Sequence, residues 1–438
     1  MNDFYPLCQK EITNLHPDES ISFYYQGETS DFCRFNQGLI RQVGTVSQHC
    51  LTISLTKNQR QAQYLIDLSL DNDRDALMIK DAISNLRDYC QSLPIDPFLT
   101  LPEQVISSQH YQKNQLPKPI EAVDDILNLA GKLDFVGILG IGTVSHGFFN
   151  SMGQQNWYDT HFYDLDASIY HQSSATKMVS SGFEWNRREI QDKLSDNQEF
   201  LQVMATGDLT LKAGQYRVYL APAAVESIIN LINWGGFSKK AAETKVSPLS
   251  MLINGKKNLS EKLTIIENTE NAMAPPFDRL GFKRPTQSTL IAKGAHAGHL
   301  VSSRSAKEFQ IPSTGANFQE RGESLDVDTG ELEKSDILSR IQDGIYISNL
   351  WYLNYSDQTN CRITGMTRFA TMRVKNGKLV GPIKTMRFDE SIYRILGTNL
   401  KEVTSFSDLV PSTSTYGSRS TDSIRVPGLL IDSFTFTL

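Results

Sequence analysis

Two histidines, His296 and His299, are the closest histidine pair in the chain, and such a pair is a natural place to look for metal chemistry. On a helix, a spacing of three residues would put both imidazoles on one face. The surrounding segment, GAHAG at residues 294–298, is a poor helix former and is flanked by predicted strands. On a strand, an odd spacing sends the two side chains to opposite faces. We therefore expect an exposed histidine pair in a hairpin, without a metal.

The acidic run DNDRD at residues 71–75 imitates the start of a calcium-binding loop. Such a loop needs glycine at its sixth position and glutamate at its twelfth, where this chain has Ala76 and Ala82. Helix capping explains the acids better, and we expect a helix over residues 73–92 with Asp73 as its N-cap. Its predicted apolar side consists of Ala76, Leu77, Ile79, Ile83 and Leu86.

Residues 139–146, LGIGTVSH, contain two further patterns with chemical potential. A dinucleotide fingerprint would need a third glycine where Ser145 stands, and no P-loop Lys-Ser pair occurs, so we expect Gly140 and Gly142 to lie in a turn between strands. A serine hydrolase would need Ser145 and His146 in contact and oriented by an acid. Adjacent residues on a strand point to opposite faces, so we expect no nucleophile here.

A basic and hydroxylated zone lies in the last third of the chain. It consists of Arg362, Thr364, Thr367, Arg368, Arg373 and Arg387. One interpretation is a solvated strand face with ordinary ion pairs. The alternative is the wall of a chamber, where arginine forks grip the carboxylates or main-chain carbonyls of a peptide.

Aromatic residues precede this zone at Trp351, Tyr352 and Tyr355. They could supply apolar contact to a peptide, or they could belong to the core or to a subunit interface. The candidate peptide-binding residues are Arg362, Thr364, Arg368, Trp351 and Tyr352.

Length and composition limit the class of protein. The chain has 438 residues, 39% hydrophobic and 21% charged, which is enough for two or three domains with a large core. A net charge of −6 argues against broad binding of nucleic acid. The N-terminus lacks the regions of a signal peptide and no apolar run reaches the ~20 residues that span a bilayer, so we expect a cytoplasmic protein without membrane contact. The five cysteines form no C-x-x-C and predict reduced thiols.

The first half of the chain predicts a mixture of strands and helices. A partly helical start ends before His16 and Pro17, and alternating apolar residues at 20–26, 31–41 and 49–55 predict an antiparallel meander. Prolines mark residues 94–119 as an extended connector. A helix at 120–132, strands at 134–141, 145–150 and 157–169, and one or two helices within 185–205 complete this half.

The second half is richer in strands. A strand at 216–220 leads into an apolar helix that ends at Gly235 and Gly236, and a polar helical segment follows at 238–253. Asn376-Gly377 is a strong signal for a type I′ hairpin turn, and Asn254-Gly255 is either such a turn or a helix stop. Further strands are predicted at 263–267, 288–292, 299–304, 344–353, 361–375, 378–383 and 429–437.

The polar segment at residues 206–214, with two glycines, is the predicted domain boundary. The sequence therefore predicts an α+β protein of two domains. Residues 1–210 form the N-terminal α+β domain, and residues 211–438 form a β-rich C-terminal domain.

Four motifs in the second half carry a family resemblance. They are PPFD at 275–278 before Gly281, STGAN at 313–317, LWY at 350–352 with TGMTR at 364–368, and VKNGKLVGPI at 374–383. In this order and spacing they resemble the TldD/PmbA family, the modulators of DNA gyrase. Leu280 departs from the acidic residue that the family has before this glycine. The STGAN segment is either a plain turn or a loop that faces a peptide.

The resemblance implies a two-domain α/β protomer whose TldD-like and TldE-like subunits pair around a chamber that holds the active site. In the catalytic branch, the helix after residue 220 carries H-E-x-x-x-H, and a cysteine near the C-terminus completes a zinc site. By position, the two histidines would fall near Asn230 and Gly235, but residues 221–234 contain no histidine. Residues 409–426 contain no cysteine, and Cys361 lies upstream. A zinc hydrolase needs about three protein ligands, so the chain is similar to the non-catalytic TldE (PmbA) branch.

The resemblance therefore predicts a zinc-free TldE-like subunit that closes the chamber of a metallopeptidase complex acting on small unfolded or leader peptides. The expected partners are a TldD-like catalytic subunit, or a second copy of this chain, and a peptide. No catalytic residue, metal ligand or cofactor is expected in this chain, and zinc is expected only in the partner. The first alternative is an independent peptide-binding or scaffold protein that kept the fold. The second is an enzyme that uses another nucleophile or metal.

Overall fold

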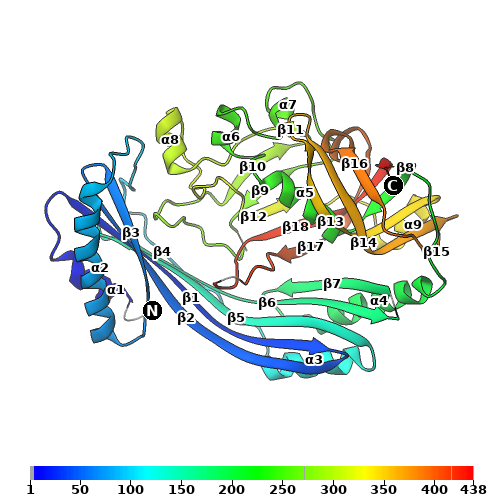
Figure 1. Ribbon diagram of the computed structural model, residues 1–438, viewed down its shortest axis with the longest axis horizontal. Helices are drawn as coiled ribbons and strands as arrows, with labels where there is room; N and C mark the ends of the chain where they lie inside the picture. The colour runs from blue at the N-terminus through cyan, green and yellow to red at the C-terminus, as the bar shows by residue number, and fades with distance from the viewer. Residues whose placement is uncertain (1–3, 173, 271, 416, 438) are drawn as a thin grey trace.

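The computed structural model is built on two β-sheets (Figure 1). It describes residues 4–172, 174–270, 272–415 and 417–437. Within these residues, seven strands form an N-terminal sheet and eleven strands form a C-terminal sheet. The chain passes from one sheet to the other between α4, which ends at Met204, and β8, which begins at Gly214. The predicted α+β class is confirmed. The domain division at residues 210 and 211 stays a prediction.

The N-terminal sheet has the strand order β3-β2-β1-β5-β6-β4, and β7 pairs with β6. Its strands are β1 (Glu19–Asn36), β2 (Leu39–Lys57), β3 (Arg60–Asp67), β4 (Ser108–Tyr111), β5 (Asp134–Asn150), β6 (Gln155–His171) and β7 (Ser174–Gly182). Two predicted breaks, at residues 27–30 and 142–144, are wrong because β1 and β5 continue through them as neighbours in the sheet. The predicted strand at 31–41 is also wrong in extent, since Gln37 and Gly38 form a turn with φ of 53° and 68°.

Helices cover the outer face of this sheet at two places. α1 (Phe4–Ile12) and α2 (Asn72–Ser92) pack over one end, and α3 (Pro119–Ala130) and α4 (Arg187–Met204) over the other (Figure 1). The α2 cap is Asp71 rather than the predicted Asp73, because the Asp71 side chain accepts from two main-chain N–H groups of the first turn. Leu77, predicted on the apolar side of α2, is 60% exposed. Asp75 is buried and accepts hydrogen bonds from residues 69 and 70, so the acidic run does cap a helix.

The C-terminal sheet has the order β11-β10-β9-β12-β18-β16-β14-β13-β8, with β15 on β14 and β17 on β18. Its strands are β8 (Gly214–Leu220), β9 (Ile265–Asn268), β10 (Gln287–Ala292), β11 (Ala295–His296), β12 (Ser324–Val327), β13 (Gly344–Asp357), β14 (Arg362–Lys375), β15 (Lys378–Pro382), β16 (Arg387–Ser391), β17 (Leu400–Pro411) and β18 (Ser423–Phe436). β18 also pairs with β8, so strands β8, β13, β14, β16 and β18 close into a ring.

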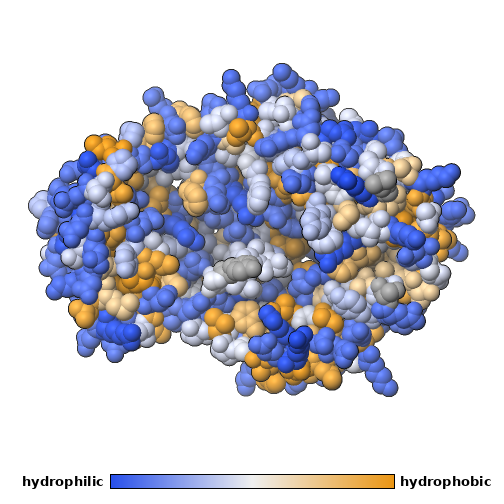
Figure 2. All heavy atoms as spheres, viewed as in Figure 1, coloured by the Kyte–Doolittle hydropathy of each residue, from blue (hydrophilic) through white to orange (hydrophobic). Residues whose placement is uncertain are grey.

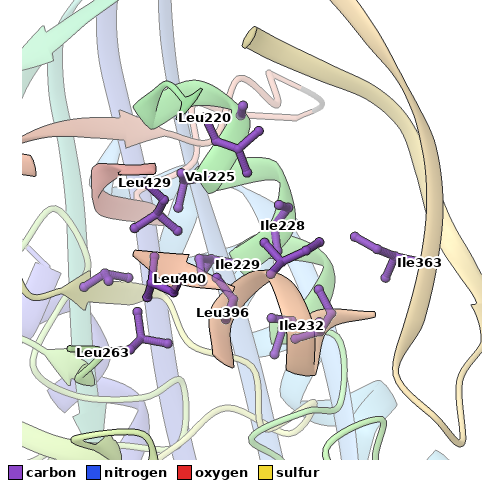
Figure 3. Packing of buried hydrophobic residues seen from close by; sticks show 14 of the residues in the cluster. Leu220, Val225, Ile228, Ile229, Ile232, Leu263, Ile363, Leu396, Leu400 and Leu429 are labelled. Atoms are coloured by element: carbon purple, nitrogen blue, oxygen red, sulfur yellow. The ribbon is translucent and has the colours of Figure 1, made fainter. Parts of the chain in front are cut away.

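Helix α5 (Pro222–Asn233) provides the core of this part. Ile228, Ile229 and Ile232 are buried among side chains from β13, β14, β17 and β18 (Figure 3). A helix that is apolar nearly all round is stable only when it is enclosed in this way. The other helices here are short: α6 (Lys239–Glu243), α7 (Ser250–Ile253), α8 (Ser303–Phe309), η1 (Lys334–Asp336), α9 (Ile337–Ile341) and η2 (Arg394–Thr398).

Three predicted elements of the second half have clear outcomes. The strand expected at 299–304 is wrong, because Ser302 caps α8 by accepting from the Ser305 N–H. The hairpin turn is confirmed, since Asn376 and Gly377 have φ of 48° and 70° between β14 and β15. Asn254 ends α7, so its glycine neighbour is part of a helix stop. No helix among the described residues is both long enough and apolar enough to cross a bilayer.

Candidate functional site

A half-buried polar strip runs along the otherwise apolar helix α5. It consists of Glu226, Ser227 and Asn230, which are spaced so that they share one side of the helix. A guanidinium nitrogen of Arg321 donates to Asn230 Oδ1 at 2.9 Å. One turn on, the Asn233 amide exchanges two 2.8 Å hydrogen bonds with the main chain of Gly322. The loop that contains Arg321 is therefore fastened along this strip.

Electrostatics make Glu226 the unusual member of the strip. Burial raises the pKa of its carboxyl to about 7, although the Ser227 hydroxyl and the Arg321 guanidinium act in the opposite direction. Near neutral pH this group is therefore present in both protonated and ionised forms. The strip offers hydrogen-bond donors and acceptors of the kind that bind a peptide main chain.

The strip does not present the ligand set of a zinc site. It contributes one carboxylate, whereas a zinc hydrolase needs about three ligands. Cys361 is buried, burial raises the pKa of its thiol to about 12, and a thiolate ligand is therefore disfavoured there. Among the described residues, three potential ligand atoms lie within 4.8 Å of one another only at His16, Asp18 and Glu19. Glu19 is already paired with Arg87. That this chain holds no zinc stays a prediction.

The hairpin of β13 and β14 brings three of the five candidate peptide-binding residues together. The Arg368 guanidinium lies 4.3 Å from the ring centroid of Trp351 and 4.8 Å from that of Phe369. Trp351 and Tyr352 are in ring contact at 4.3 Å. Trp351 is 43% exposed and Tyr352 is 69% exposed, so these side chains form an aromatic surface with a cation. Such a surface is suited to hold an extended chain.

The other two candidates have partners of their own. Arg362 forms an ion pair with Asp389 on β16, and Thr364 donates to the Phe388 carbonyl at 2.9 Å. Thr364 lies on the same side of β14 as Arg368, as expected from the alternation, but it is directed at the neighbouring strand. Binding of peptide by any of the five residues stays a prediction. Tyr355 donates to the Leu231 carbonyl at 3.1 Å and so fixes the hairpin to α5.

Of the remaining members of the basic zone, Arg373 and Thr367 have partners within the fold, and Arg387 is exposed. Arg373 pairs with Asp343 and donates to the Gly344 carbonyl, and Thr367 is buried and accepts from the Met386 N–H. The interpretation as ordinary ion pairs therefore holds for Arg362 and Arg373.

The histidine pair differs from its prediction. The rings of His296 and His299 lie 4.4 Å apart and are half-buried, so neither opposite faces nor full exposure is correct. The reason is that β11 ends at His296 and the chain turns at Gly298. Burial, with His296 and Lys239 nearby, lowers the pKa of His299 to about 4. His296 Nε2 and His299 Nδ1 lack hydrogen-bond partners among the described residues, but the pair supplies only two ligands.

Ser145 and His146 are separated as predicted, although the predicted turn at Gly140 and Gly142 is wrong. All four residues lie inside β5, between β1 and β6. His146 is buried, its Nδ1 is 2.7 Å from the Tyr24 hydroxyl, and burial lowers its pKa to about 3. A neutral histidine held by a tyrosine is a core residue rather than a base for Ser145.

The sequence pattern did not predict a buried charged cluster beside the strip. Arg284 forms ion pairs with Glu267 and Glu323, and burial raises the pKa values of Asp278 and Asp422 to about 7. The members come from four separate segments, and only Asp278 and Arg284 are close in the sequence, so no local spacing connects the cluster as a whole. The PPFD motif, which ends at Asp278, was the single available signal. Arg321 was missed for the same reason.

One protein family and several solved structures resemble this chain. The family model of the PmbA/TldA metallopeptidase C-terminal domain matches residues 213–438. TldE from Thermococcus kodakarensis has a TM-score of 0.77 at 16% identity, with 99% of this chain and 100% of that chain covered. A candidate modulator of DNA gyrase from Bacteroides thetaiotaomicron VPI-5482 has a TM-score of 0.76 at 17% identity, covering 100% and 99%.

A second candidate modulator of a DNA gyrase, from Thermotoga maritima MSB8, has a TM-score of 0.75 at 13% identity, covering 100% of this chain and 99% of that chain. At these identities the three structures show a shared fold. No curated protein matches the sequence.

Proposed function

Because this chain belongs to the PmbA/TldD family, we propose that it is a zinc-free, TldE-like subunit of a metallopeptidase complex. In this role it closes a chamber, holds a small unfolded or leader peptide, and leaves cleavage to a TldD-like partner that carries the zinc. The observation that carries the proposal is the polar strip of α5. Where the catalytic branch has histidines, this strip has Asn230 hydrogen-bonded to Arg321.

Two further features support a peptide-holding role. Glu226 in the strip and Arg321 beside it provide an acceptor and a donor, and Arg368 with Trp351 provides an aromatic and cationic surface on the hairpin. The molecule is hollowed near its centre, between the N-terminal sheet and the C-terminal part, and hydrophilic side chains surround this hollow (Figure 2). A subunit with such a concave face is suited to form half of a chamber.

The test combines metal analysis with reconstitution. The chain purified alone and dialysed should contain no stoichiometric zinc and should not cleave an unfolded peptide. Mixed with a TldD-like protein that carries H-E-x-x-x-H, it should co-purify with that partner and raise its peptidase activity. Stoichiometric zinc in the chain alone, lost on replacing His296 and His299 by alanine, would overturn the proposal. A chain that binds peptide but ignores every TldD-like partner would support the independent scaffold instead.

A further inference from the structure

Two histidine nitrogens are buried without hydrogen-bond partners at the turn that follows β11 (Figure 1). They are Nε2 of His296 and Nδ1 of His299, and neither has a partner in the part of the chain that the structure describes. The two rings are half-buried, and their centroids lie 4.4 Å apart. Because buried polar atoms nearly always have partners, two such nitrogens in neighbouring rings point to a shared ligand.

The main chain determines which nitrogen of each ring carries the proton. Burial lowers the pKa of both rings, but a hydrogen bond with the main chain of Gly298 acts in the opposite direction for His296, and one with Phe237 does so for His299. A hydrogen bond raises the pKa of a histidine only when the ring donates, so each ring donates to a carbonyl. The donating atoms are Nδ1 of His296 and Nε2 of His299, because the other two nitrogens have no partner. Those two nitrogens therefore carry free lone pairs.

This arrangement is typical of histidines that bind a metal. Such a histidine donates its other N–H to a main-chain carbonyl or a carboxylate, and this bond fixes the tautomer and the orientation of the ring. Both His296 and His299 have an anchor of this kind, and both retain the neutral nitrogen that a metal ion requires. A water molecule that donates to both nitrogens is the competing occupant.

The separation of the two rings selects the class of ion. A metal–nitrogen bond of about 2.0 Å puts each ring centroid about 3.2 Å from the ion, so two rings bound at a right angle have centroids about 4.5 Å apart, and two at the tetrahedral angle about 5.2 Å. The observed 4.4 Å corresponds to adjacent positions of a square-planar or tetragonal site. Cu²⁺ and Ni²⁺ prefer such sites, whereas Zn²⁺ prefers a tetrahedron.

Charged groups around the pair act in both directions. Besides burial, the Lys239 ammonium lowers the pKa of both rings, so it opposes a positive charge beside them. This charge is partly balanced, because Lys239 pairs with Glu243 at 2.5 Å. The buried Glu320 carboxylate, which accepts from the Ser238 hydroxyl at 2.7 Å, acts in the opposite direction on the pKa of His299. Lys239 therefore destabilises a bound cation, and Glu320 stabilises one.

We propose that His296 and His299 bind one divalent ion of the tetragonal class, through Nε2 of His296 and Nδ1 of His299. Cu²⁺ binds most tightly and Ni²⁺ next, and Zn²⁺ binds more weakly than either, because rings this close do not suit a tetrahedron. Water fills the remaining positions of the ion. The site goes beyond the proposed function, which concerns zinc and peptides, and it joins β11 to the segment that precedes α8.

The experiment uses the full chain, freed of metal by a chelator and dialysed. Calorimetry should detect one Cu²⁺ per chain, weaker binding of Ni²⁺ and the weakest binding of Zn²⁺. Electron paramagnetic resonance of the Cu²⁺ complex should show a tetragonal ion with two coordinated imidazoles. Ni²⁺ should raise the melting temperature of the chain, because the site exists only in the folded state.

Four variants separate this pair from other binding sites. His296→Ala and His299→Ala should each abolish the stoichiometric binding and the signal of two imidazoles. The control His16→Ala should bind Cu²⁺ as the parent does, although His16 lies beside two carboxylates. Lys239→Met should tighten Cu²⁺ binding severalfold, because it removes a positive charge beside the ion without removing a ligand.

Three results would overturn the proposal. One is Cu²⁺ binding that survives the replacement of either histidine. The second is a spectrum of the parent with fewer than two imidazoles, which decides the question even if a histidine variant fails to fold. The third is no binding of any of the three ions, or tighter binding of Zn²⁺ than of Cu²⁺. Without binding, a bridging water is the occupant of the pair.

These outcomes are separate from those of the proposed function. A chain that fails to pair with a TldD-like partner can still bind Cu²⁺ at the histidine pair. A chain that raises the peptidase activity of such a partner can still bind no ion.

Discussion

Arg368 is the residue whose surroundings best match a peptide contact. It stacks on Trp351 and Phe369 and remains exposed, so a bound peptide can reach its guanidinium. Arg368→Ala should lower peptide processing by the reconstituted complex about ten- to a hundredfold, because a hydrogen bond to a charged group contributes roughly 1.5–3 kcal/mol. Stability should change by about 1 kcal/mol or less, since an exposed cation–π contact contributes little. Steady-state kinetics and thermal melting of the variant measure the two effects.

The control for Arg368 is Lys375→Ala, an exposed cation at the far end of the same strand β14. It should leave processing unchanged. If Arg368→Ala melts early while the complexes that survive cleave normally, Arg368 is a structural residue and the peptide lies elsewhere.

Glu226 gives a prediction about pH. Its pKa is raised from 4.5 to about 7 in the folded chain, so the folded state holds this proton more tightly than the unfolded state does. Its effect on the free energy of unfolding is therefore constant below about pH 4.5, becomes less favourable between about 4.5 and 7, and is constant above. Glu226→Gln should relieve this loss and raise stability at pH 8, relative to pH 4.5, by up to about 3 kcal/mol.

Urea unfolding of parent and variant at both pH values checks this prediction. The comparison must be between proteins at each pH, because burial also raises the pKa values of Asp278 and Asp422. The exposed residue Glu261 supplies the control, and Glu261→Gln should show no such difference. An unchanged pH dependence in Glu226→Gln would mean that this carboxyl is ionised in the folded chain.

The sequence does not predict which side chains that are distant in the chain become partners in the fold. Arginines and aromatic residues near residues 351–368 could be selected by type, and Arg368 and Trp351 do meet. Arg321 meets Asn230 across 91 positions of the chain, and no periodicity encodes such a contact. The same holds for Arg419, which reaches Asp164 on β6.

Among the elements, the turn between β14 and β15 offers the sharpest test. Gly377 has φ of 70°, and an added Cβ would lie 3.3 Å from the Cα of Ser339. Gly377→Ala should lower the free energy of unfolding by about 1–2 kcal/mol, because an L-residue is disfavoured in the left-handed region. Gly255 has a similar φ of 66° but no atom within 4 Å of an added Cβ.

Gly255→Ala is therefore the matched control, because it measures the free-energy cost of a positive φ without a close contact to the added Cβ. Urea midpoints of the two variants should both fall, with Gly377→Ala falling further. Equal midpoints for the two would show that the approach to Ser339 costs nothing, and parent-like midpoints for both would contradict the assigned turn.

Elements with strong local signals were predicted well, and those decided by neighbours were not. α5 follows from its run of apolar residues after Pro222, and the Asn376-Gly377 turn from its two left-handed positions. β1 was split at residues 27–30 because a polar stretch with a glycine resembles a turn. In the fold, β2 and β5 pair with those residues on both sides and keep them extended. The sequence did not predict α8. Ser302 is its N-cap, but the residues that follow have no helical spacing of apolar side chains.

For the whole molecule, the question is how the hollow face is closed. The N-terminal and C-terminal sheets are joined by contacts of α4 and β7 with β17, among them Lys193 with Asp408 and Ser181 with the Leu409 carbonyl. The two parts are also joined by hydrogen bonds from Tyr158 to the Ala272 carbonyl and from Gln154 to the Gly281 carbonyl. Under the proposed function, a second subunit closes the hollow into a chamber.

We expect a stable dimer, with a TldD-like partner when one is present and with itself when the chain is expressed alone. Closing the hollow requires a specific contact of about 1,200 Å² or more, which is typical of complexes that persist at micromolar concentration. Light scattering of the pure chain, and of the mixture with a TldD-like protein, measures the mass directly. A strict monomer under both conditions would favour the independent scaffold.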